Sequence, residues 1–179
     1  MTTRPTLFLT VGLPGTGKTT EARRIEVEER ALRLTKDEWV KALHGSDNPP
    51  SASAVIEGRL IEVGLRALGL GINVVLDFGL WSRDERSALR QAAADLGAPV
   101  RLRYCEIPPA EQRRRLDRRQ TEQPHSTWPI TDDELTEWTS SFVIPTPAEL
   151  EGSEPVDRPP AGFATWEEWR RHRWPLAGS

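Results

Sequence analysis

The stretch Thr6-Leu-Phe-Leu-Thr-Val11, followed at once by Gly12-Leu-Pro-Gly-Thr-Gly-Lys-Thr19, decides the fold of this 179-residue chain. The first half is a short apolar run typical of a buried strand, and the second half matches G-x-x-x-x-G-K-[ST], the phosphate-binding P-loop. Residues 19–30 contain no Gly or Pro and many good helix formers, so a helix is expected directly after the loop. The sequence therefore predicts a strand, a phosphate-binding loop and a helix in succession.

Each part of this loop has a chemical role. Its glycines let successive backbone N–H groups face one concavity, where they and the positive end of the helix hold the β- and γ-phosphates. Lys18 adds a point charge, and Thr19 offers a hydroxyl to Mg²⁺, which prefers oxygen ligands. We therefore expect ATP and Mg²⁺ as cofactors. The expected cofactor-binding residues are Gly12, Leu13, Pro14, Gly15, Thr16, Gly17, Lys18, Thr19 and Thr20.

Composition limits the remaining possibilities. A hydrophobic content of 37% and a charged content of 28% over 179 residues fit one globular domain spanning residues 1–179. The net charge of −3 argues against a broad basic face that coats nucleic acid. Cys105 has no second cysteine with which to form an internal disulfide. Because no run approaches the ~20 apolar residues of a membrane span, we expect no membrane partner and a soluble, cytoplasmic protein.

Strand and helix patterns alternate along the chain, which is typical of an α/β fold with a parallel sheet flanked by helices. The expected strands after the first are 31–34, 73–77 and 100–105, and the expected helices are 52–68, 82–96 and 109–120. Capping-box patterns place helix starts at Ser82, Thr131 and Thr165. The Pro-rich segment 145–179 is expected to wrap the surface, with a short strand near Val156.

Two carboxylates lie at the ends of predicted strands. In open α/β sheets, ligands bind beyond the carboxyl ends of the strands, where Asp37 and Asp77 are expected. Asp77 closes an apolar strand and is predicted to hold Mg²⁺ together with Thr19, directly or through water. Asp37 is predicted to accept the proton of an attacking hydroxyl. The structural alternatives are a helix N-cap for Asp37 and a turn residue for Asp77.

An arginine-rich helix is expected to form part of a lid over residues 109–130. Arg115 and Arg119 lie one turn apart, as do Arg114 and Arg118. A guanidinium that closes over the transferring phosphoryl group stabilises its negative charge, so Arg115 and Arg119 are candidate catalytic residues. The alternative is a solvated helix whose arginines pair with its own acidic residues.

Seven tryptophans are many for this length and suggest aromatic walls of an acceptor pocket. Trp39 and Trp81 rank first because they follow the two candidate carboxylates closely. Trp138 lies on an apolar helix face, and core packing is the favoured interpretation for it. Arg83 is a candidate contact for an acceptor anion or, alternatively, a solvated residue in the first turn of a helix.

Four segments together resemble small P-loop kinases of the AAA_33 type, a group related to polynucleotide kinases, zeta toxins and chloramphenicol phosphotransferase-like enzymes. They are Gly12–Thr20, Thr35–Trp39, Val75–Arg86 and Thr131–Pro147. The resemblance implies a nucleoside-kinase-like fold with an Arg-bearing lid, and transfer of phosphate from ATP to a hydroxyl. It also implies that Asp37 activates the acceptor hydroxyl and that Arg119 is a lid arginine.

Two positions depart from this family pattern. Polynucleotide kinases have an arginine three residues after the base, where this chain has Val40. A second basic lid residue is expected near Gln123, where only His125 is close.

We therefore expect a phosphotransferase acting on a small metabolite or antibiotic-like hydroxyl acceptor. The alternatives are a 5′-hydroxyl polynucleotide kinase, with nucleic acid as a less favoured partner, and a nucleotide-dependent switch or accessory ATPase.

Overall fold

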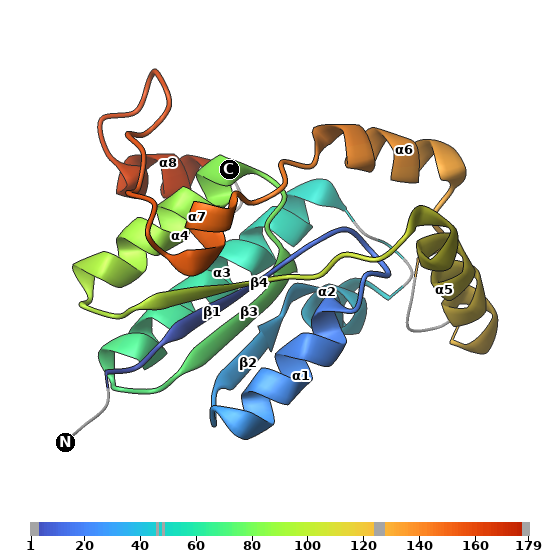
Figure 1. The fold of residues 1–179 in the computed structure, drawn as a ribbon, viewed down its shortest axis with the longest axis horizontal. Coiled ribbons are helices and arrows are strands. Elements are labelled where there is room, and N and C mark those ends of the chain that lie inside the picture. The colour runs from blue at the N-terminus through green and yellow to red at the C-terminus, as the bar shows by residue number, and fades with distance from the viewer. Residues whose placement is uncertain (1–3, 46, 48, 124–127, 177–179) are drawn as a thin grey trace.

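A parallel sheet of four strands, ordered β2-β3-β1-β4, forms the centre of the computed structural model, which describes residues 4–45, 47, 49–123 and 128–176 (Figure 1). The strands are β1 (Leu7–Val11), β2 (Leu32–Thr35), β3 (Val74–Gly79) and β4 (Val100–Tyr104). Leu7 lies opposite both Val74 and Val100, so the strands start level. Their carboxyl ends therefore meet at one edge, which is where an open α/β sheet binds its ligands.

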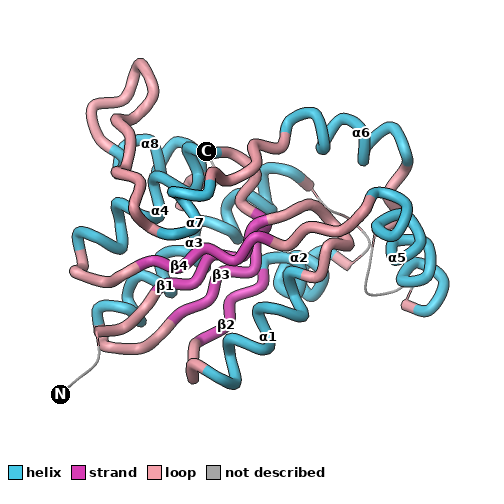
Figure 2. Tube along the Cα trace, viewed as in Figure 1, coloured by secondary structure: helices cyan, strands magenta, loops and turns pink. Residues whose placement is uncertain are grey.

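Helices cover both faces of the sheet, which confirms the predicted α/β class (Figure 2). They are α1 (Lys18–Glu28), α2 (Lys36–His44), α3 (Pro50–Gly69), α4 (Arg83–Asp95), α5 (Pro109–Glu122), α6 (Asp132–Ser141), α7 (Pro147–Glu151) and α8 (Trp166–Arg173). Every residue of β1 is buried, as expected for a central parallel strand. One core cluster joins the sheet to α3, α4 and α8, and a smaller one joins it to α1.

Most predicted elements are present within a few residues of their expected ends. The Ser82 and Thr131 hydroxyls accept from the backbone N–H groups three residues on, and both capping boxes are complete. The Thr165 hydroxyl caps α8 in the same way. Two short helices, α2 and α7, were not predicted, because α2 begins immediately where β2 ends and α7 has only five residues.

One detail of the prediction is wrong. Residues 153–160 contain no strand, because prolines at 155, 159 and 160 remove the N–H donors that a ladder needs. Val156 instead packs against the main core.

The C-terminal segment packs against α4 through both aromatic and charged side chains. Trp169 contacts Trp166 and Trp174 edge-on, with ring centroids 5.6 and 5.7 Å apart. Arg86 of α4 and Glu149 of α7 form a fully buried ion pair, with Nε to Oε1 at 2.6 Å and Nη2 to Oε2 at 3.1 Å. This segment is therefore part of the core.

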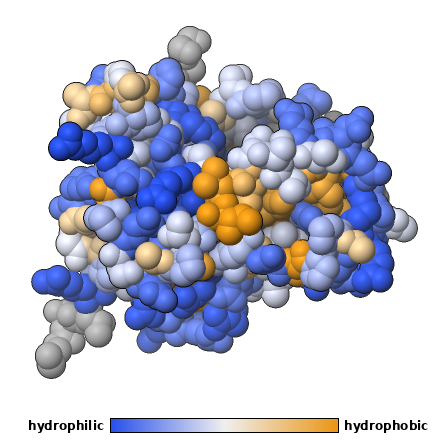
Figure 3. Space-filling view, turned by 45° about the horizontal axis from the view of Figure 1, so that its top comes forward, coloured by the Kyte–Doolittle hydropathy of each residue, from blue (hydrophilic) through white to orange (hydrophobic). Residues whose placement is uncertain are grey.

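The face of the molecule drawn in Figure 3 is mostly hydrophilic. In the face drawn in Figure 3, apolar side chains gather in a band near the middle, surrounded by polar residues. Among the described helices, none is long and apolar enough to cross a membrane.

Candidate functional site

The P-loop joins β1 to α1 at the carboxyl edge of the sheet. Gly17, with φ of 100°, precedes the first helical residue, Lys18, so the backbone turns sharply into the helix. The Thr16 hydroxyl and the Lys18 ammonium both donate to the Leu13 carbonyl, each at 2.8 Å. Lys18 thus lies over the loop, next to the space where loop amides and the α1 N-terminus converge. This arrangement suits bound phosphates.

Gly12 allows the loop to rest on the end of β4. A Cβ added there would lie 2.5 Å from the Cys105 carbonyl oxygen and 2.8 Å from Thr16 Oγ1. The Cys105 N–H also donates to the Val11 carbonyl at 2.8 Å. Any side chain at position 12 would therefore push the loop away from the neighbouring strand.

Asp77 is buried beneath the loop among hydroxyl groups. The hydroxyls of Thr10 and Thr35 lie 3.4 Å from its two carboxylate oxygens, and Thr19 also hydrogen-bonds to it. Burial raises the pKa of Asp77, while the Thr19 hydrogen bond and the charge of Lys18 oppose that rise. Asp77 lies within β3, so it is not the turn residue of the alternative interpretation.

The adjoining oxygens of Thr19 and Asp77 fit a magnesium ion that also binds nucleotide phosphates. Mg²⁺ is commonly held by one or two protein oxygens, with phosphates and water completing the shell. In the described ranges, no group of three or more His, Cys, Asp or Glu side chains forms a metal cluster. Thr19 and Asp77 would supply two protein oxygens of this kind.

Lys18, Asp37 and Asp77 lie within electrostatic reach of one another. Burial lowers the pKa of Lys18, and the charges of Asp77 and Asp37 oppose this effect. Asp77 in turn interacts with Asp37. The tertiary structure thus brings together three candidate residues that are 19 to 59 positions apart in sequence.

Asp37 lies in the first turn of α2, directly after β2. The helix N-cap is Thr35, so Asp37 does not have the capping role of the alternative interpretation. Its side chain is 60% exposed, with a carboxylate oxygen 3.9 Å from Lys36 Nζ. Trp39 is also exposed, whereas Val40 is completely buried. An acceptor can approach Asp37 and Trp39, but position 40 faces the core.

Trp81 lies against the start of the P-loop. Its indole N–H donates to the Gly12 carbonyl at 3.2 Å, and its ring centroid is 5.5 Å from that of Trp138. The chain reaches this position through Gly79 and Leu80, which have φ of 99° and 45°. Trp138 was predicted to be core, which is wrong: α6 buries no residue fully, and Trp138 packs on Trp81.

Helix α5 packs directly on the P-loop. Gln112 Nε2 donates to the Pro14 carbonyl at 2.7 Å, and Leu116 would lie 3.0 Å from a Cβ at Gly15. Figure 1 shows α5 and α6 together beyond the carboxyl ends of the strands. Gln112 was missed in the sequence, because a single glutamine in an arginine-rich helix carries no recognisable pattern.

The two candidate lid arginines differ in position. Arg115 Nη1 lies 3.9 Å from the place of a Cβ at Gly17, while its Nε donates to Glu111 at 2.8 Å. Arg119 is exposed. Arg114 bonds to Glu111 rather than to the loop. His125, the basic residue close to the expected second lid position, lies outside the described residues.

Arg83 begins α4 and bonds to the C-terminal segment. Its Nε and Nη2 contact Asp157 and Glu154 at 2.7 and 2.8 Å. The Arg83 guanidinium, which was predicted to bind an acceptor anion, is therefore already bonded to two carboxylates. Such a role stays a prediction and would require Arg83 to exchange these partners.

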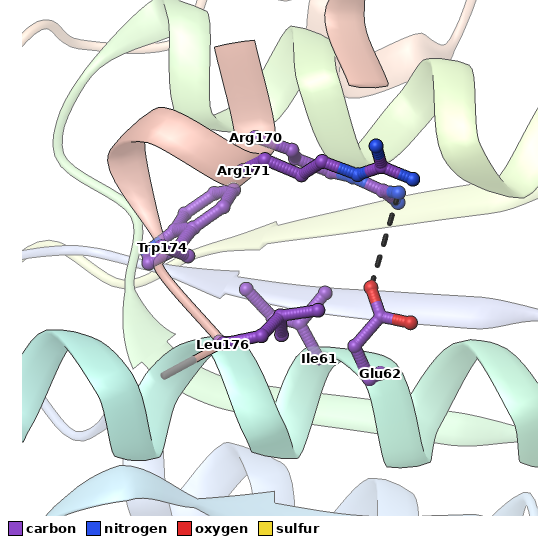
Figure 4. Close-up of a pocket in the computed structure, with 7 residues that line it drawn as sticks. Ile61, Glu62, Arg170, Arg171, Trp174 and Leu176 are labelled. Atoms are coloured by element: carbon purple, nitrogen blue, oxygen red, sulfur yellow. Dashed lines mark ion pairs between the residues drawn. The ribbon is translucent and has the colours of Figure 1, made fainter. Parts of the chain in front are cut away.

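Two hollows lie away from the P-loop. The smaller, about 10 Å³, lies between α3 and α8 beside the Glu62–Arg170 ion pair of 3.9 Å (Figure 4). The larger, about 370 Å³, lies between α3, α4 and α8. Neither contains a predicted site residue. The candidate site is the region around the P-loop, where Lys18, Trp81 and Gln112 meet.

The chain belongs to the AAA_33 family, described as an AAA domain, which matches residues 7–145. This match includes the P-loop, Asp37, Asp77, Trp81, α5 and α6. None of the curated proteins matches the chain.

Several solved structures share the fold. Kti12 of Chaetomium thermophilum in complex with ADP-AlF3 is 19% identical over 79% of this chain and 82% of its own, with a TM-score of 0.62. A putative kinase from Chloroflexus aurantiacus is 19% identical over 96% and 99%, with a TM-score of 0.61. A chain of the Pnkp1/Rnl/Hen1 RNA repair complex is 19% identical over 86% of this chain and 47% of its own, with a TM-score of 0.65. These likenesses confirm the predicted P-loop fold.

Proposed function

We propose that the protein is an ATP- and Mg²⁺-dependent phosphotransferase that moves the γ-phosphate to a hydroxyl group of a small molecule. The observation that carries this proposal is the grouping of Lys18, Asp37 and Asp77 beside one P-loop. An exposed carboxylate next to the phosphate site can accept the proton of an attacking alcohol. Solved structures with this fold include an APS kinase and a gluconokinase, which agrees with kinase chemistry.

Each site residue has a defined role in this proposal. Lys18 and the loop amides hold the β- and γ-phosphates, and Thr19 and Asp77 position Mg²⁺, which neutralises phosphate charge when bound. Asp37 orients the acceptor hydroxyl and accepts its proton as the oxygen attacks phosphorus. Arg115 is the lid cation nearest the loop, with Arg119 one turn further along α5. Trp39 and Trp81 line the acceptor side.

A second candidate is an ATP-dependent accessory protein without a small-molecule acceptor. The fold likeness to Kti12 in complex with ADP-AlF3 supports this candidate. A 5′-hydroxyl polynucleotide kinase is less well supported, because Val40 is buried and Arg83 bonds to two carboxylates.

The test is transfer of γ-labelled phosphate from ATP to nucleosides, aminoglycosides, other hydroxyl-bearing antibiotics and 5′-hydroxyl oligonucleotides. Asp37→Asn should keep its affinity for Mg·ATP but lower the transfer rate by ~10²-fold or more. The matched control is Asp95→Asn, which alters an exposed carboxylate at the end of α4. Undiminished transfer by Asp37→Asn would remove it as the base, and acceptor-independent hydrolysis at a full rate would favour the accessory ATPase.

A further inference from the structure

The arginines that flank the acceptor side are already paired within the chain. Arg33 precedes α2, which carries Asp37, and Arg83 follows Trp81 by two residues. The carboxylates that hold them are Glu26 and Glu38 for Arg33, at 2.8 and 2.9 Å, and Asp157 and Glu154 for Arg83, at 2.7 and 2.8 Å. An anionic acceptor would have to take these guanidiniums from existing partners.

Helix α6, which lies beside the acceptor side, is acidic. It contains Asp132, Asp133, Glu134 and Glu137 and no Lys, Arg or His. Its Trp138 packs on Trp81. Asp132 contacts Arg113 and Glu134 caps its own helix, whereas Asp133 and Glu137 are exposed on α6. The resulting negative potential attracts cations to this side of the site.

Aromatic faces in the same region suit a positive charge. The Lys41 ammonium lies 4.4 Å from the centroid of the Trp128 ring, so one ring here already contacts an ammonium group. Trp39 is 52% exposed, and the Trp81–Trp138 pair lies beside the P-loop. Tryptophan is the most favourable aromatic partner for an ammonium group. The acceptor side thus combines acidic charge with tryptophan faces.

Resting on the proposed phosphotransferase function, we infer that the acceptor is an organic cation, a hydroxyl compound whose protonated or quaternary nitrogen packs against Trp81 and Trp138. In the transfer, the acceptor oxygen forms a bond to the γ-phosphorus as the bond to the β–γ bridging oxygen breaks. Asp37 takes the hydroxyl proton, and ADP leaves. The positive nitrogen stays against the rings and near the acidic α6, so it orients the hydroxyl toward Asp37.

Binding of simple charged probes tests this inference without requiring catalysis. With ADP and Mg²⁺ present, tryptophan fluorescence is titrated with benzyltrimethylammonium, benzyl alcohol and phenyl phosphate. We expect the cation to bind about tenfold more tightly than phenyl phosphate, as a desolvated cation–π contact allows. Trp81→Phe should remove most of the fluorescence change. Tighter binding of phenyl phosphate, or no saturable binding of the cation, would overturn the inference.

Two charge-reversal variants test whether the cation binds beside α6. Glu137→Lys on α6 should raise the dissociation constant of benzyltrimethylammonium about threefold or more at low salt, while Glu151→Lys on α7 should leave it unchanged. Equal shifts in both variants would contradict a site beside α6. The binding of these probes does not depend on phosphate transfer. If the protein is not a phosphotransferase, the labelled-ATP assay shows no transfer, whatever the probe titrations give.

Discussion

At the scale of single residues, the site contrasts two carboxylates with different surroundings. Asp37 is largely exposed at the start of α2, where an incoming hydroxyl can reach it. Asp77 is buried beneath the P-loop, among the hydroxyls of Thr10, Thr19 and Thr35. Solvent access therefore suits Asp37 to proton transfer, and enclosure beside the phosphate loop suits Asp77 to holding a cation.

In the ligand-free protein, the buried negative charge of Asp77 is expected to lower the free energy of unfolding. Because burial raises its pKa above the ordinary 3.8, the folded state binds a proton more readily than the unfolded state. Stability is therefore lost as pH rises from the ordinary value through the raised pKa. Asp77→Asn should stabilise the ligand-free protein at neutral pH, with a smaller gain near pH 4.

Urea unfolding at several pH values, without nucleotide or metal, measures this difference. Asp95→Asn, at the exposed end of α4, is the control and should not change the pH dependence. A ligand-free Asp77→Asn variant that is less stable than the wild type at neutral pH would contradict the prediction.

At the scale of elements, Gln112 and Leu116 of α5 contact the P-loop directly. Gln112→Ala removes one neutral hydrogen bond, typically about 1 kcal/mol, so the KM for ATP should rise about fivefold. Steady-state kinetics at saturating acceptor check this prediction. Arg118→Ala, an exposed change on the same helix, should leave the KM unchanged; an equal rise in both variants would argue against the specific contact.

The second joined pair of elements is α4 and the C-terminal segment. Arg86 bonds to Glu149 and to the carbonyls of Leu80 and Val143, at 3.2 and 3.0 Å, so it also supports the backbone that carries Trp81. Glu149→Ala leaves a buried guanidinium without its carboxylate and should cost about 3–5 kcal/mol of unfolding free energy.

Equilibrium denaturation measures this cost. The matched control is Glu167→Ala, which breaks the exposed Glu167–Arg171 pair on α8 and should cost at most about 1 kcal/mol. If the two variants lost similar stability, the buried pair would have no special structural role.

At the scale of the whole molecule, ligand binding should stabilise the fold, because the P-loop, Asp77 and α5 meet only when the chain is folded. At about 100 times the dissociation constant, Mg·ATP should add about 2.7 kcal/mol, which corresponds to a rise in Tm of roughly 5 °C or more. Thermal unfolding with Mg·ATP, with ATP plus EDTA and with Lys18→Ala tests this. EDTA should reduce the shift and Lys18→Ala should nearly abolish it; an undiminished shift in Lys18→Ala would contradict the proposed phosphate site.

Much of the fold was predictable because its signals are local. The P-loop, the alternation of strands and helices and the capping boxes each occupy a few consecutive residues, and the structure has them all. The helix α2 escaped prediction because Thr35 both ends β2 and caps the helix, leaving no loop between them. Trp138 was wrongly predicted to lie in the core. An apolar helix face can pack on the core or on a single aromatic ring outside it, and here Trp138 packs on Trp81.

The sequence by itself determined the α/β class, the nucleotide-binding loop and the placing of Asp37 and Asp77 near the carboxyl ends of strands, because backbone geometry and turn chemistry act over short distances. Only the tertiary structure decided which side chains reach the loop: Gln112 and Trp81 contact it, while Arg83 turns to the C-terminal segment. These choices depend on contacts between segments more than 60 residues apart. No local pattern encodes such contacts, since they follow from how the packed elements place each side chain.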